Sequence, residues 1–403
     1  MKIKPIVMRD LARSHPEDDN LDLLGTQAMS QRHLEWNSVK LNDRRVDQLN
    51  VTRDRSGPIA YVHKAAKALA TSMGPAVVLV AEANGLAKVV ITPLGEQLAR
   101  AFETDFALIH EEYQPYAFSP VYMLMQRIAR LFPLKFRGSL NKSLSLKDAE
   151  TLVRKIECVI GVLRRSLSAP ELKQAQQNFR RNAIANFNGL CDGFDWLAER
   201  HEEAVVLRFE VFLRPHDSQP VNFGEKPDLA LLDEFHPLCT RFQRFMAHHF
   251  GKALLLGFAW TLEHGRESGF HKHFVVVLRA RGNEDHVAVV EQLIRKWEQL
   301  TGGRGHAHSS NKDGGRHHRR AVGLVNLRDP QVAAGLRRIA AYFTLAGLFV
   351  KLDVPQSFDT FGKGRFPKKP LPTDLAGRPR KRPPGSRIRM SVTQYEKNHL
   401  HFM

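Results

Sequence analysis

The spacing of apolar residues changes near residue 200, and the two halves of the chain predict different structures. In the first half, apolar residues recur every three or four positions, as in amphipathic helices. This periodicity predicts helices over residues 121–132, 145–167 and 168–197. Residues 76–81 and 87–92 are short apolar runs separated by Asn84 and Gly85, which is typical of a β-hairpin. Residues 1–60 are polar and weakly periodic, so we expect a flexible or peripheral segment.

After residue 200 the pattern predicts a clearer succession of strands and helices. Short apolar runs predict strands over residues 205–213, 253–262, 270–278 and 321–327. Helical periodicity appears over residues 233–250, 287–300 and 331–350. The order β-α-β-β-α-β, followed by one more helix, is that of the split βαβ arrangement with an antiparallel sheet. We therefore predict an α+β fold, with a ferredoxin-like C-terminal domain preceded by a mainly helical N-terminal region.

Four parts are predicted along the 403 residues, a length sufficient for two or three domains. Residues 1–60 form the flexible or peripheral segment, and residues 61–200 form a mainly helical region that carries no chemical motif. Residues 201–352 contain the split βαβ domain. Residues 353–403 form a basic tail rich in proline, which is typical of an extended chain. We therefore expect the chemistry in the second half.

The chain is strongly basic, with 60 Lys and Arg against 42 Asp and Glu and a formal net charge of +18. A polyanion is the expected partner, and nucleic acid is the commonest one. Residues 304–338 carry a net charge of +6 and residues 361–392 a net charge of +9, so these two stretches hold fifteen of the eighteen charges. The basicity is a property of the C-terminal third.

The cysteine content and the apolar runs exclude several classes of protein. Cys158, Cys191 and Cys239 are far apart and form no CxxC pair, which argues against a disulfide framework or a zinc ribbon. The first residues lack the apolar core of a signal peptide. The longest apolar runs, residues 253–262 and 339–350, are shorter than a membrane span. We expect a cytoplasmic protein with no membrane partner and no small-molecule cofactor.

The strongest chemical signal lies in the predicted hairpin. Side chains two apart on a strand share a face, so His271 and His273 project together. Glu263 ends the preceding strand, and the hairpin can bring its carboxylate opposite the two imidazoles. These three residues are predicted to bind a metal, and Mg²⁺ or Mn²⁺ suits phosphodiester chemistry. The alternative is a pair of hairpin histidines that bind nothing.

The motif His-x-His alone carries little information, because the chain has 19 histidines and three such pairs. The pair of His271 and His273 differs from the others because it lies in an apolar strand beside an acidic residue. His306 and His308 fall instead in a stretch rich in Gly, His and Arg, which predicts a solvated basic loop.

Six tyrosines are the candidates for a nucleophile, and only Tyr342 and Tyr395 follow the histidine pair. On the predicted last helix, Tyr342 lies about 120° from the centre of the apolar face and one turn after Arg338. A tyrosine outside the core and beside an arginine can offer its hydroxyl to a phosphate. The alternatives are a boundary tyrosine that covers the core, or Tyr395 in the tail as the nucleophile.

These features resemble a known domain over roughly residues 187–366. A first strand of the type VVLRFEVFL, the motif W-x-L-E-x-G-x-x-x-G-[FY]-H-x-H and Ala-Tyr-Phe on a helix are similar to the YagK/YfjJ domain. That domain occurs in gene-II-type replication proteins of inoviruses (filamentous phages) and prophages, which are similar to the HUH superfamily of rolling-circle replication initiators. The resemblance implies an HUH-type domain in which Glu263, His271 and His273 bind the metal and Tyr342 is the catalytic tyrosine.

The activity implied by the resemblance is that of a single-strand DNA endonuclease and strand transferase. Tyr342 would attack a phosphate at a replication origin, form a 5′-phosphotyrosine and release a 3′-OH that primes a polymerase. The chain has no helicase P-loop, so unwinding requires a host helicase or a supercoiled substrate. The expected partners are single-stranded origin DNA and the host helicase and polymerase.

Basic residues downstream of the hairpin are expected to contact the DNA backbone. They are Arg338 on the last helix, three arginines of the Gly/His/Arg-rich stretch and five residues of the tail, namely Arg316, Arg319, Arg320, Lys368, Lys369, Arg380, Lys381 and Arg382.

Two residues depart from the pattern of the family. Lys272 stands where a hydrophobic residue usually separates the histidines, so we expect its sheet face to be more exposed or its charge to snorkel. Leu345 stands where the family tends to have a lysine. Either departure fits an alternative function, a catalytically degenerate prophage protein that binds or regulates DNA without cleaving it. An RNA-binding protein is a third alternative, disfavoured because the first and third strands lack an RNP-like aromatic set.

Overall fold

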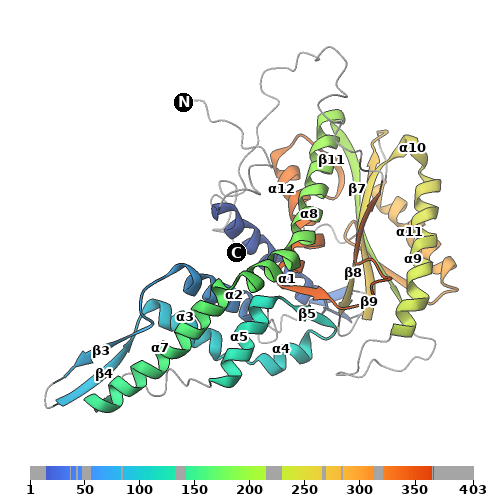
Figure 1. The fold of residues 1–403 in the computed structure, drawn as a ribbon. Helices are drawn as coiled ribbons and strands as arrows, with labels where there is room; N and C mark the ends of the chain where they lie inside the picture. Colours follow the sequence, from blue (N-terminus) through green and yellow to red (C-terminus); the bar gives the residue numbers. More distant parts are fainter. Residues whose placement is uncertain are drawn as a thin grey trace, which may run out of the picture. The chain divides into compact units, whose positions relative to one another are not determined.

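The computed structural model describes most of the chain between residues 15 and 366. The described residues are 15–36, 38–41, 44–47, 56–82, 85–132, 142–214, 229–265, 269–282, 285–312, 321–364 and 366. They belong to two compact units (Figure 1). Unit 1 takes its residues from 1–48, 183–346 and 354–403, and unit 2 from 49–182 and 347–353. The contiguous domains that we predicted, with limits at residues 60, 200 and 352, therefore do not coincide with these units.

Unit 1 contains an antiparallel sheet in the order β10-β7-β9-β8-β13, with β11 paired to the first part of β7. Its strands are β7 (Glu203–Leu213), β8 (Leu255–Gly265), β9 (Gly269–Arg279), β10 (Gly305–Ser309), β11 (Gly323–Asn326) and β13 (Phe361–Gly364). The expected α+β class with a C-terminal antiparallel sheet is confirmed. Two short strands of this sheet were not predicted: β10, which has little apolar character, and β13, which lies at the start of the expected basic tail.

The register of the sheet aligns two rows of side chains on one face, because residues directly opposite in an antiparallel pair point to the same side. Each row crosses β10, β7, β9 and β8 in turn. The first row is His306, Phe212, His271 and Glu263, and the second is His308, Glu210, His273 and Thr261. The two histidines of β9 therefore lie between an acidic residue of β7 and one of β8. We call this side of the sheet the histidine face.

The opposite face of the sheet is covered by α9 (Leu229–His249) and α11 (His286–Leu300), which lie together on one side of β7, β8 and β9 (Figure 1). Its core is aromatic and joins Phe209, Phe242, Phe274 and Trp297 through ring contacts. Lys272 also points to this face and is buried, with its ammonium nitrogen 3.8 Å from the centre of the Trp260 ring. The expectation of a more exposed face was wrong, because a cation–π contact accommodates the charge inside the core.

Helices α12 (Pro330–Thr344) and α1 (His15–Trp36) pack against each other, and α12 lies on the histidine face. Between residues 21 and 32 of α1, the buried positions recur at helical spacing and are Leu21, Leu24, Gly25, Ala28, Met29 and Arg32. This segment is therefore an ordered part of unit 1, and the expectation of a flexible or peripheral segment was wrong for residues 15–36. The periodicity was faint in the sequence because glycine and arginine occupy two of the buried positions.

The predicted last helix is shorter than expected and ends at Thr344, not at residue 350. A 3₁₀ turn, Leu345–Leu348, and the strand β12 (Val350–Leu352) follow it. β12 belongs to unit 2. Unit 1 also contains α10 (Gly251–Leu254) and the antiparallel pair β1 (Ser38–Leu41) and β2 (Arg44–Asp47).

Unit 2 is mainly helical and carries two small sheets. The predicted hairpin is confirmed as β3 (Val77–Ala81) and β4 (Leu86–Ile91), with β6 (Ser143–Ser145) beside β4, while β12 pairs with β5 (Tyr116–Phe118). Its helices are α2 (Ser56–Thr71), α3 (Pro93–Phe102), α4 (Phe106–Glu112), α5 (Pro120–Leu131), α7 (Leu146–Ser168) and the first part of α8 (Pro170–Arg200). Ser119 and Ser145 cap α5 and α7, because their side-chain oxygens accept hydrogen bonds from the backbone N–H groups of Tyr122 and Asp148.

Phe366 fixes the chain after β13 by packing against two glycines. A Cβ at Gly193 of α8 would lie 2.8 Å from the Phe366 ring, and one at Gly257 of β8 would lie 2.7 Å from it. Gly193→Ala therefore displaces the ring, and we expect the free energy of unfolding to fall by about 1–3 kcal/mol. Urea denaturation measures this change.

Gly189→Ala, one turn earlier on α8, is the matched control. A Cβ at this position meets only the flexible end of Lys363. We expect this substitution to be neutral or to stabilise the protein by up to about 1 kcal/mol, because alanine favours the helix. Equal losses of stability in the two variants would contradict this account of Phe366.

Candidate functional site

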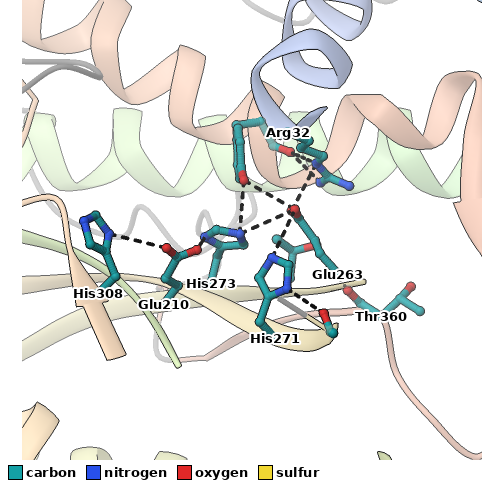
Figure 2. Close-up of polar contacts among 10 residues, drawn as sticks. Arg32, Glu210, Glu263, His271, His273, His308 and Thr360 are labelled. Carbon is teal, nitrogen blue, oxygen red and sulfur yellow. Dashed lines mark hydrogen bonds and ion pairs between the residues drawn. The ribbon is translucent and has the colours of Figure 1, made fainter. Parts of the chain in front are cut away.

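The two rows of the histidine face converge on a buried polar cluster (Figure 2). Glu210, Glu263, His271 and His273 each expose 3% or less of their surface. Charged and polar groups buried to this extent require partners, because burial removes their contacts with water. The partners within the cluster determine what each side chain can do.

His271 has a defined orientation because its Nδ1 lies 3.0 Å from the carbonyl oxygen of Gly269. A carbonyl only accepts hydrogen bonds, so Nδ1 carries the proton and Nε2 of neutral His271 carries the free lone pair. That Nε2 lies 3.8 Å from Glu263 Oε2. Gly269 itself has a φ of 62°, a left-handed conformation that glycine adopts without strain, and this conformation begins β9.

His273 lies between the two carboxylates of the cluster. Its Nδ1 is 3.2 Å from Glu210 Oε2, and its Nε2 is 3.4 Å from Glu263 Oε2. The outer oxygen of Glu210, Oε1, is 3.4 Å from Nδ1 of His308 on β10. Figure 2 shows His308, Glu210 and His273 in succession across the sheet. The prediction of a solvated loop was therefore wrong for His306 and His308, which lie in β10.

Tyr342 reaches this cluster from α12. Its hydroxyl donates a hydrogen bond to Glu263 Oε2 at 3.3 Å and lies 3.1 Å from His273 Nε2. The tyrosine is fully buried, and every residue from Ile339 to Thr344 is also buried. The expectation that Tyr342 lies outside the core was wrong, because this part of α12 is covered on all sides. The structure nevertheless places Tyr342 in one cluster with the three residues that the sequence predicted as metal ligands.

Arg32 of α1 was not predicted and completes the cluster. Its Nε lies 3.0 Å from Glu263 Oε1, and the guanidinium also donates to the backbone carbonyl of Tyr342. The guanidinium of Arg208, on β7, lies 4.7 Å from the centre of the Tyr342 ring, and that of Arg32 lies 5.3 Å from it. Two cations therefore flank the tyrosine ring.

The charges of the cluster shift the pKa values of its members. Burial by itself raises the pKa of Glu263, but the positive charge of Arg32 and the neighbouring His273 outweigh burial and lower this pKa to about 2. Burial lowers the pKa of His271, and repulsion from His273 acts in the same direction. At neutral pH the cluster therefore contains an ionised Glu263 and a neutral His271, the forms that bind metal ions.

The cluster has the donor set of a metal site. Glu210, His271 and His273 are buried, and one ligand atom from each lies within 4.8 Å of the others, so this group could hold a metal ion. Glu263 faces the same two imidazoles from β8. Glu210 was missed by the sequence analysis, although Arg208 and Glu210 form a polar pair at strand spacing in the otherwise apolar β7, which was a usable signal.

Of the residues predicted to contact DNA, the structure describes only Arg338. Arg338 is described and is exposed on α12, one turn before Tyr342. Leu345 is buried in the 3₁₀ turn that follows α12. The other predicted contacts lie outside the described residues, as does the alternative nucleophile: Arg316, Arg319, Arg320, Lys368, Lys369, Arg380, Lys381, Arg382 and Tyr395.

Comparison of the chain with protein-family models, with curated proteins and with solved structures finds no match. In the part of the chain that the structure describes, no helix combines the length and the apolar character needed to cross a membrane. The function must therefore be argued from the site itself.

Arg32→Ala is expected to destabilise unit 1 by about 3–5 kcal/mol, because it leaves the ionised Glu263 buried without its cation. Urea denaturation of the full chain gives this value. The matched control is Arg338→Ala, which removes an exposed arginine and should change the stability by less than about 0.5 kcal/mol. A similar small effect for Arg32→Ala would show that the ion pair contributes nothing.

The low pKa of Glu263 also predicts an acid dependence of stability. Since the pKa in the folded protein is about 2 against an ordinary value of 4.5, ionised Glu263 stabilises the fold above pH 4.5, and this contribution is lost as the pH falls towards 2. The loss should be on the order of 3 kcal/mol. Urea denaturation across this range, in the presence of a chelator, should give a steeper decline for the wild-type protein than for Glu263→Gln. Parallel declines would contradict the prediction.

Proposed function

We propose that this protein is a single-strand DNA endonuclease of the HUH type, which nicks an origin with Tyr342 and remains attached to the 5′ end. The observation that carries the proposal is the position of the Tyr342 hydroxyl, 3.1 Å from His273 Nε2 and 3.3 Å from Glu263 Oε2. The tyrosine, the histidine pair and the carboxylate come from three separate elements. Their convergence is what a metal-assisted attack by tyrosine on a phosphate requires.

The topology supports the proposal. The fourth strand here is β10 and not β11, the strand predicted at residues 321–327. Counting β7, β8, β9 and β10 as the first to fourth strands, their order in the sheet is 4-1-3-2, and all neighbours are antiparallel. Helix α9 connects the first strand to the second, and α11 connects the third to the fourth. This order is compatible with the split βαβ arrangement that we propose. The histidine pair lies on β9, a central strand, which gives the site a rigid base.

The donor set fits a divalent cation at the Nε2 side of the histidines. The Nδ1 atoms of His271 and His273 are turned towards Gly269 and Glu210, so the two Nε2 atoms face Glu263. We therefore assign Glu263, His271 and His273 as the residues that would hold Mg²⁺ or Mn²⁺. When bound, the cation would supply positive charge against the negative charge that develops on the scissile phosphate.

The chain's own residues account for the covalent step. The Tyr342 oxygen forms the new bond to phosphorus, the bond from phosphorus to the 3′ oxygen breaks, and the 3′ oxygen leaves and takes a proton from solvent. Glu263 Oε2 accepts the hydrogen bond of the hydroxyl and so orients its oxygen, and the hydroxyl proton passes to solvent. One phosphodiester is exchanged for another, so the reverse reaction can rejoin the strands. Arg32 and Arg208 supply fixed positive charge beside the ring.

A second candidate function is DNA binding without cleavage, in a catalytically degenerate prophage protein. Two observations favour it. Tyr342 is fully buried, so a phosphate reaches its hydroxyl only if the covering elements move, and Leu345 stands where the family tends to have lysine. The strong positive charge of the C-terminal third serves either function.

A covalent adduct distinguishes the two functions. The full chain is incubated with Mn²⁺ and a pool of single-stranded oligonucleotides, and denaturing electrophoresis reports protein linked to DNA. We expect an adduct for the wild-type protein and none for Tyr342→Phe, because phenylalanine lacks the attacking oxygen. His271→Ala should greatly reduce the adduct, since it removes one expected ligand of the cation.

Tyr61→Phe is the control for the tyrosine variant, because Tyr61 lies in unit 2 and contacts Arg100 there. This variant should form the adduct at the wild-type level. The absence of any adduct across a wide pool, together with salt-sensitive DNA binding, would replace the endonuclease with the non-cleaving protein. An adduct that survives Tyr342→Phe would assign the nucleophile to another tyrosine.

A further inference from the structure

Two carboxylates contact His273, and only one of them can lie on the same side as the tyrosine. Glu263 faces Nε2, the nitrogen that also lies 3.1 Å from the Tyr342 hydroxyl. Glu210 faces Nδ1, on the other side of the ring. A cation that activates a phosphate beside Tyr342 must therefore lie on the Nε2 side, and Glu210 is left for another role.

Glu210 has the geometry of a carboxylate that orients a metal ligand. A ligating histidine commonly donates its second ring N–H to a carboxylate or to a backbone carbonyl, which fixes the tautomer and the ring orientation. In this cluster, Gly269 provides the carbonyl for His271 at 3.0 Å, and Glu210 provides the carboxylate for His273 at 3.2 Å. Each histidine thus has its own acceptor at Nδ1.

Glu210 is in turn held by a second imidazole. Its Oε1 lies 3.4 Å from Nδ1 of His308, while its Oε2 faces His273. These three side chains occupy one row of the sheet, on β10, β7 and β9 (Figure 2). The Glu210 carboxylate is buried, and the His308 side chain is 29% exposed, so the row leads from the rim of the sheet to the centre of the cluster.

We propose that Glu210 and His308 are positioning residues that act in series on His273: His308 orients Glu210, and Glu210 holds His273 with Nε2 turned towards the cation. This inference rests on the proposed metal centre and adds to it a function for two residues that do not themselves bind the cation. Loss of such outer partners typically weakens metal binding by about 10- to 100-fold.

Isothermal titration of the full chain with Mn²⁺ tests the inference without any DNA reaction. Glu210→Gln should weaken Mn²⁺ binding about 10- to 100-fold, because an amide has only one acceptor oxygen and no negative charge to hold the two imidazoles. His308→Ala should also weaken binding, by a smaller factor. The matched control is His306→Ala on the same strand and face, which lies opposite Phe212 and should bind as the wild type does.

The double variant separates an action in series from general damage to the fold. If His308 acts through Glu210, then His308→Ala adds no further loss of Mn²⁺ affinity in the Glu210→Gln background. Co²⁺ in place of Mn²⁺ gives a second measure: its absorption spectrum should be retained in Glu210→Gln and changed in Glu263→Gln, because only the latter alters the ligand set. Additive losses in the double variant would overturn the inference.

Other outcomes are equally decisive. A Co²⁺ spectrum that changes in Glu210→Gln would make Glu210 a direct ligand, and Mn²⁺ affinity equal to the wild type in both Glu210→Gln and His308→Ala would remove any positioning role. Either result overturns this inference alone. A wild-type protein that binds Mn²⁺ but forms no DNA adduct would overturn only the proposed function. A wild-type protein that binds no Mn²⁺ would overturn the metal centre and the inference together.

Discussion

The backbone pairing of β9 is the constraint on which the site depends. This strand is hydrogen-bonded on both sides, to β7 and to β8, so its register is fixed twice. Because alternate side chains share a face, the same register that buries Phe274 among aromatic rings turns His271 and His273 to the other side. A slip of one residue would exchange the two sets. The core and the candidate site are therefore specified by one set of hydrogen bonds.

Charge balance is the second requirement. The histidine face buries two carboxylates and two imidazoles, and it is stabilised by cations that come from outside the hairpin. Arg32 lies far from Glu263 in the sequence, yet it supplies the positive charge that keeps this carboxylate ionised. Burying an ion pair gains little net stability, whereas breaking one leaves a costly unpaired charge. The buried charge of Glu263 therefore requires Arg32 beside it, and the helix that carries Arg32 belongs to the site.

Helices and strands with a strong pattern of apolar residues were predicted correctly, and those with a weak pattern were missed. The hairpin of β8 and β9 was recognised because both strands are apolar runs, and its three polar residues stood out against that background. The roles of Arg32, Glu210 and His308 depend on contacts across large sequence separations, which local patterns do not encode. The position of Tyr342 was misjudged for a related reason: helical periodicity describes one buried face, whereas α12 is buried on several.

The path of the chain between Tyr342 and β13 has a consequence for dissecting the protein. After α12 the chain leaves unit 1, contributes β12 to unit 2 and returns to complete the sheet with β13. Together with α1, this path interleaves the two units along the sequence. A contiguous fragment limited to residues 201–352 would lack both Arg32 and the edge strand, and β12 would lose its partner β5. The shortest contiguous fragment that retains every contact of the histidine cluster must run from Arg32 to Tyr342, which is almost the whole of the chain that the structure describes.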